Sequence, residues 1–120
     1  MGATYSVSFI LKFTDEKGAV NALHDRLTTN YNEFQFPSFK EAGIKSLWDI
    51  NDLMRVILAA PQGHVTIEPE NGFTRYENDF DASYGWELVL QGAFEVMRPF
   101  LIKGSKVIIC PDNEKYVLEV

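Results

Sequence analysis

The chain of 120 residues has one cysteine, Cys110, and two histidines, His24 and His64. A single cysteine excludes an intrachain disulfide framework and any multi-cysteine metal site within one chain. Cys110 ends an apolar run, so we expect a small buried hydrophobic residue rather than a nucleophile. Neither histidine lies in an HExxH or similar frame, and the sequence therefore offers no local motif for metal binding or acid–base catalysis.

Positive charge is scarce. The chain has 11 Lys and Arg against 17 Asp and Glu, which gives a net charge of −6 and a pI of about 4.8. Binding to nucleic acid or to an anionic membrane needs a concentration of Lys and Arg. We therefore expect neither as a partner, whereas an acidic surface suits a basic protein.

Sequence signals for membranes and for common cofactors are missing as well. There is no apolar run near 18 residues and no signal-peptide pattern, so we expect a cytoplasmic protein. There is also no Walker A loop, no GxGxxG and no GxSxG. We expect no cofactor, no metal and no catalytic residue. The sequence therefore favours a non-enzymatic protein over an enzyme.

The chain has the composition of a folded globular protein, with 46% hydrophobic and 13% aromatic residues. This favours one domain over residues 1–120. The periodicities predict, in order, a strand over 5–13, a helix from 15 to about 29, a helix from 46 to about 60, strands over 64–68 and 73–80, a helix over 84–101, and strands over 106–110 and 115–120.

Two hairpins join the four later strands, the first at Asn71-Gly72 and the second at Pro111-Asp112-Asn113. The prediction is an α+β two-layer sandwich of order β-α-α-β-β-α-β-β. It has a mostly antiparallel sheet of about five strands and three helices on one face. Residues 31–45 are the least regular part of the chain, although Phe34 and Phe36 could form a short strand. Their aromatic residues either plug the core or frame a pocket.

Polar residues predict where the helices begin, and Thr14 or Asp15 should cap the first of them. Ser83 is the expected N-cap of the helix over 84–101, because its hydroxyl can accept from a first-turn N–H. Pro99 should kink the end of that helix. Ser46 and Asp49 resemble the two ends of a capping box, with Asp49 already inside the helix.

The run Glu77-Asn78-Asp79-Phe80-Asp81 is the most acidic stretch. Asp79 and Asp81 would share one face of a strand, where they could hold a hard cation. An EF-hand loop from Asp79 fails, because Tyr84 and Leu90 stand where Gly and Glu are needed. The favoured interpretation is a solvated strand end that leads into a helix.

Several apolar residues fall off the predicted core faces. Trp48 is either covered by the aromatic residues 34–39 or offered to a partner. Leu88 with Gly92 makes a small notch that could seat a twofold partner. The last strand, which contains Tyr116 and Leu118, could pair with a second copy or with a peptide if it is an edge.

Three functions remain open. The first is a non-enzymatic interaction or regulatory domain that acts as a homodimer. The second is an acidic inhibitor or immunity-type protein that binds a basic surface through one continuous face of carboxylates: Glu68, Glu70, Glu77, Asp79, Asp81 and Glu87. The third is a small-molecule binder or enzyme with a pocket under residues 31–45. Under the first two, the partner is a second copy or another protein.

Overall fold

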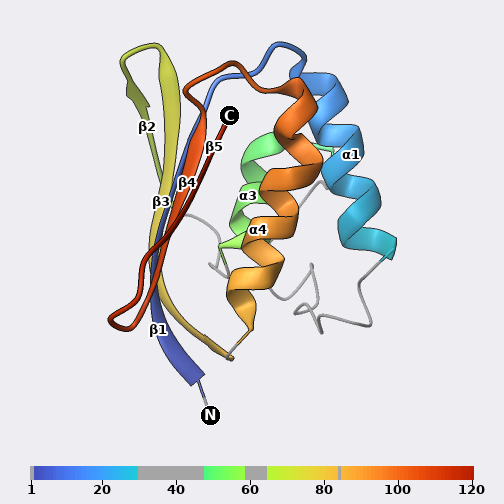
Figure 1. Cartoon of the computed structure of the whole chain (residues 1–120). Coiled ribbons are helices and arrows are strands. Elements are labelled where there is room, and N and C mark those ends of the chain that lie inside the picture. Colours follow the sequence, from blue (N-terminus) through green and yellow to red (C-terminus); the bar gives the residue numbers. More distant parts are fainter. Residues whose placement is uncertain (1, 30–47, 59–64, 84) are drawn as a thin grey trace.

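The computed structural model describes residues 2–29, 48–58, 65–83 and 85–120 (Figure 1). Its elements are β1 (Gly2–Leu11), α1 (Glu16–Thr29), α3 (Ile50–Ile57), β2 (Thr66–Glu70), β3 (Phe73–Ser83), α4 (Trp86–Met97), the 3₁₀ turn η1 (Arg98–Phe100), β4 (Lys106–Pro111) and β5 (Tyr116–Glu119). The predicted α+β architecture and its element order are confirmed. These residues form one five-stranded antiparallel sheet, in the order β2-β3-β1-β4-β5, and three helices.

The central strand is β1, which pairs with β3 on one side and with β4 on the other. Its odd residues from Ala3 to Leu11 are buried, and its even residues are exposed or half-buried. This is the period-two alternation that the sequence predicts. The strand nevertheless begins at Gly2 rather than Tyr5 and ends before Phe13, because its pairing extends to Gly2 opposite Ser83.

The β2–β3 hairpin turns at Asn71 and Gly72, as predicted. Both residues have positive φ, 53° and 86°, which the type I′ turn of a two-residue hairpin requires. β2 spans Thr66–Glu70 rather than 64–68, so Pro69 lies within the strand. This position is tolerated because β2 is an edge of the sheet.

Helix starts are partly as predicted. The Asp15 carboxylate caps α1 by accepting from the Gly18 N–H at 3.0 Å. The prediction for α3 is wrong, because Asp49 lies before the helix as its N-cap and accepts from the Asp52 N–H at 3.1 Å. Ser46 lies outside the described residues.

Both predicted ends of α4 are wrong. Ser83 is the last residue of β3, and Gly85, with a φ of 99°, is the N-cap. The helix ends at Met97 and tightens into the 3₁₀ turn, because Pro99 has no N–H for the next helical bond. Leu101 is extended and forms a bridge with Phe13.

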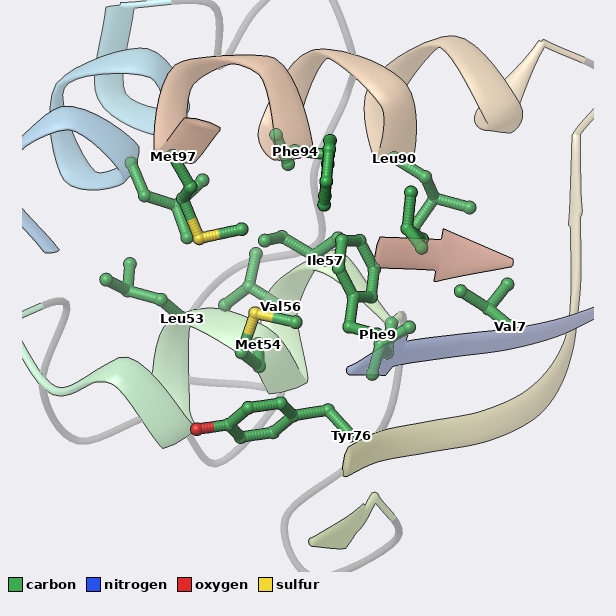
Figure 2. Packing of buried hydrophobic residues seen from close by; sticks show 14 of the residues in the cluster. Val7, Phe9, Leu53, Met54, Val56, Ile57, Tyr76, Leu90, Phe94 and Met97 are labelled. Atoms are coloured by element: carbon green, nitrogen blue, oxygen red, sulfur yellow. The ribbon is translucent and has the colours of Figure 1, made fainter. Parts of the chain in front are cut away.

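The core lies between the sheet and the helices, which all cover the same face (Figure 1). Figure 2 shows Leu90, Phe94 and Met97 projecting from α4 towards Phe9 of β1 and Ile57 of α3. All five side chains are fully buried. No helix of the described residues covers the opposite face of the sheet, which we call the open face.

Candidate functional site

The open face carries a row of carboxylates along β3. Strand pairing places Glu77, Asp79 and Asp81 on this face, because they alternate with the inward-facing Tyr76 and lie opposite even-numbered residues of β1. The prediction that Asp79 and Asp81 share a strand face is therefore confirmed. β3 continues past the acidic run to Ser83, so these carboxylates lie on the exposed face near the end of the strand, shortly before α4 begins at Trp86.

Hydroxyl groups of β1 hold two of these carboxylates in place. The Thr4 hydroxyl donates to Asp81 Oδ1 at 2.9 Å, and the Ser8 hydroxyl donates to Glu77 Oε1 at 2.9 Å. No pattern in the sequence singles out either hydroxyl. Only the pairing of β1 with β3 brings them to the acidic row, and no local pattern encodes that pairing.

The acidic row continues onto β2, where Glu68 and Glu70 also point to the open face. One guanidinium lies among them: Arg75 is 3.0 Å from Glu68 and 3.7 Å from Glu70. The hydrogen bond that Arg75 donates to Glu68, followed by the negative charge of Glu77, raises the pKa of Arg75. On the open face of β2 and β3, Arg75 is thus the single cation against five carboxylates.

A shallow depression of about 340 Å³ lies beside this row, lined by Thr66, Glu77, Asn78 and Asp79. Among the described residues, Asp79 has no hydrogen-bond or ion-pair partner. Its carboxylate is exposed and available to a cationic group from outside.

The other half of the open face is less polar. Ile10, Ile108 and Cys110 lie there half-buried, and Val117 of β5 is 49% exposed beside Ile108. The prediction that Cys110 is buried is wrong, because the alternation along β4 turns Val107 and Ile109 inward instead.

The sixth predicted carboxylate, Glu87, lies apart from the other five. It is at the start of α4 in the helical layer, where it accepts from the Tyr5 hydroxyl at 2.7 Å and from the Gly85 N–H at 3.2 Å. Burial, and then this hydrogen bond, raise the pKa of Tyr5 to about 12. Glu87 also borders a second depression, of about 360 Å³, with Asp112, Glu114 and Tyr116 among its other lining residues.

Trp48 is 61% exposed and stacks on the imidazole of His24, with 3.6 Å between ring centroids. Its role as a partner contact stays a prediction. The residues expected to cover it, 34–39, and the pocket expected under 31–45 lie outside the described residues, as does His64.

Leu88 is 62% exposed on the outer surface of α4. Beside it, the expected notch at Gly92 is filled from within the protein. A Cβ at Gly92 would lie 2.2 Å from Nη2 of Arg26 on α1, so glycine is what allows this guanidinium to approach the helix. Contact of Leu88 and Gly92 with a partner stays a prediction.

Tyr116 and Leu118 lie on β5, with their side chains on the helical side of the sheet. Leu118 packs against the core, whereas Tyr116 is 37% exposed and donates a hydrogen bond to Glu114. This bond raises the pKa of Tyr116. As β5 is an edge strand, the two residues lie where a further strand could pair.

Comparison with known protein families, curated proteins and solved structures finds no match to this chain. The site must therefore be judged on its own chemistry. Within residues 2–29, 48–58, 65–83 and 85–120, no three His, Cys, Asp or Glu side chains converge as a metal site would need. None of the helices in these ranges has the length and apolar character to cross a membrane.

Proposed function

We propose that this protein is a non-enzymatic protein-binding domain whose open sheet face binds a basic surface of another protein. The observation that carries the proposal is the row of Glu77, Asp79 and Asp81 along the open face of β3. No helix of the described residues lies on that side of the sheet (Figure 1). Charge complementarity selects the kind of partner, because neither nucleic acid nor an anionic membrane would approach this face.

The electrostatics of the whole chain act in the same direction. A net charge of −6 and five carboxylates against one guanidinium on β2 and β3 attract a cationic surface and steer its approach. Association through such a face is faster at low salt and slows as salt screens the charges.

The row is also held ready for binding. Glu77 and Asp81 are fixed by the hydroxyls of Ser8 and Thr4 on a strand at the centre of the sheet. Binding therefore orders few side chains, which lowers the entropic cost of association. Asp79, between them, is left for the cation of the partner.

The apolar half of the open face supplies the second component of a protein interface. Specific interfaces combine an apolar centre with polar contacts around it. Here Ile10 of β1 lies opposite Arg75 of β3, and Ile108 of β4 and Val117 of β5 follow across the sheet, away from the acidic row. A basic surface with a small apolar patch would match both parts.

The test uses poly-L-lysine as a basic probe and poly-L-glutamate as its opposite. We expect the protein to bind poly-L-lysine only, with an affinity that falls as salt is raised. The triple substitution Glu77→Gln, Asp79→Asn, Asp81→Asn should weaken binding by about tenfold or more, the loss expected for three charge contacts at an exposed site.

A matched control removes the same charge elsewhere: Glu16→Gln, Asp25→Asn, Glu114→Gln, at three exposed residues away from the row. This triple variant should bind poly-L-lysine nearly as well as the unchanged protein. Equal losses in the two triple variants would mean that net charge alone attracts the probe, and would contradict a site on β3.

A further inference from the structure

β5 is the outermost strand on one side of the sheet, and among the described residues only β4 pairs with it (Figure 1). The opposite edge, β2, is protected against pairing by Pro69 and by two glutamates among its five residues. β5 has no proline. Two of its four residues, Tyr116 and Val117, are instead exposed hydrophobic residues.

At this edge, backbone groups of β5 have no partner strand among the described residues. In an antiparallel pair, residues alternate between pointing their N–H and C=O at the partner strand and pointing them away. Val120 N–H donates to the Ser105 carbonyl of the β4 side at 2.9 Å, so the even-numbered residues of β5 face β4. Val117 and Glu119 therefore point their backbone groups outward. The Glu119 carbonyl confirms this direction, since it accepts from Nη1 of Arg98 at 3.0 Å.

We propose that β5 pairs antiparallel with β5 of a second copy of the chain, with the two Val117 residues opposite each other on the twofold axis. In this register, Lys115, the residue directly before β5, brings the ammonium of each copy opposite the Glu119 carboxylate of the other. The outward N–H and C=O of both Val117 residues would then bond across the axis. The Glu119 carbonyl keeps its bond to Arg98, because a carbonyl has two lone pairs.

The side chains select this register over its neighbours. A shift by one residue would set open-face side chains against helix-side ones, which an antiparallel ladder does not allow. A shift by two would place Lys115 or Glu119 opposite Val117 and lose both charge pairs. In the chosen register Tyr116 also lies opposite Leu118 of the other copy, on the helical side of the sheet.

This self-complementarity is why the occupant is a second copy rather than an unrelated strand. The twofold axis would run perpendicular to the sheet, so both helical layers would lie on one side and both open faces on the other. The two sheets of five strands would become one sheet of ten. The inference does not rest on the function proposed above, since no residue of the acidic row takes part.

The test is a charge exchange followed by sedimentation velocity, from micromolar to millimolar protein. The unchanged protein should dimerise. Lys115→Glu and Glu119→Lys should each weaken self-association by about tenfold or more, because each puts like charges opposite each other twice. An equimolar mixture of these two variants should dimerise like the unchanged protein, since every crossed pair again joins a carboxylate to an ammonium.

Amide hydrogen exchange identifies the contact as strand pairing. The Val117 N–H should exchange quickly in dilute protein and slowly in concentrated protein. Lys17→Glu, the same charge change at an exposed residue of α1, should alter neither measurement. The proposal is overturned if the unchanged protein stays monomeric, if the mixture fails to recover, or if Val117 remains unprotected in the dimer.

Discussion

The guanidinium of Arg26 on α1 lies directly against Gly92 of α4, where any side chain would collide with it. This contact links the two helices at the one position of α4 that lacks a Cβ. We expect Gly92→Ala to change the free energy of unfolding little. Alanine gains about 1 kcal/mol in helix propensity, and this gain offsets the cost of displacing the Arg26 guanidinium. In an Arg26→Ala background the same substitution should stabilise by about 1 kcal/mol, which a double-mutant cycle in urea measures.

Gly18 in α1 should respond in the opposite way. A Cβ there would lie 2.7 Å from the capping Asp15 carboxylate and 2.7 Å from the Phe100 ring. The ring is packed against the core and cannot swing aside as an arginine end can. We expect Gly18→Ala to destabilise by about 1–3 kcal/mol in urea denaturation, the range for overpacking. Stabilisation would show that Phe100 is loosely held.

Removing the cap of α3 should cost about 1 kcal/mol. Asp49→Ala leaves the Asp52 N–H without its acceptor at the start of an eight-residue helix. Asp49→Asn keeps an oxygen in the same place and should lose much less. Chemical denaturation of the two variants measures the difference, and equal losses would mean that the negative charge matters rather than the hydrogen bond.

Stability should fall steeply in alkali. Burial is the main cause that raises the pKa of both Tyr5 and Tyr76 from 10.0 to about 12. The folded state therefore holds protons that the unfolded chain releases, so this stabilisation is complete below pH 10 and is lost as the pH rises from 10 to about 12. Tyr76→Phe should show a shallower loss in unfolding free energy over that range. An unchanged slope would mean that Tyr76 does not titrate on unfolding.

The acidic row should lower stability while it serves binding. Like charges at alternate positions of one strand repel, so the triple variant Glu77→Gln, Asp79→Asn, Asp81→Asn should be more stable by about 0.5–1 kcal/mol at low salt. The gain should shrink at high salt, because screening weakens the repulsion. Thermal melting at two salt concentrations measures this, and a destabilised triple variant would mean that the Ser8 and Thr4 hydroxyl bonds outweigh the repulsion.

Side-chain periodicity was enough to predict the fold. Local patterns predict which residues of β1 face the core and where the β2–β3 hairpin turns, and the structure confirms both at the odd residues of β1 and at Asn71-Gly72. The wrong predictions concern positions that depend on pairing with residues distant in the sequence. Ser83 has the chemistry of a helix cap, but its pairing with Gly2 extends β3 through it. An apolar run does not reveal which of its residues turn inward, so the prediction that Cys110 lies in the core is wrong.

The candidate site was only partly predictable for the same reason. Asp79 and Asp81 could be assigned to one strand face from their spacing. Their hydroxyl neighbours could not, because Thr4 is 77 positions from Asp81 and Ser8 is 69 from Glu77. Glu87 follows the row in sequence, but a change of direction at Gly85 places it in the helical layer, apart from the acidic face that the sequence predicts for it.

The central place of β1 in the sheet has a consequence for how the chain folds. Both of its neighbours, β3 and β4, come more than 60 residues later in the sequence. Such distant pairings slow folding, to the millisecond-to-second range typical of high contact order. During synthesis β1 leaves the ribosome before β3 and β4, so its alternating apolar side chains are exposed until these two strands have been made. A newly made chain is therefore most open to aggregation and to chaperone binding at this strand, the one that is best protected once the sheet is complete.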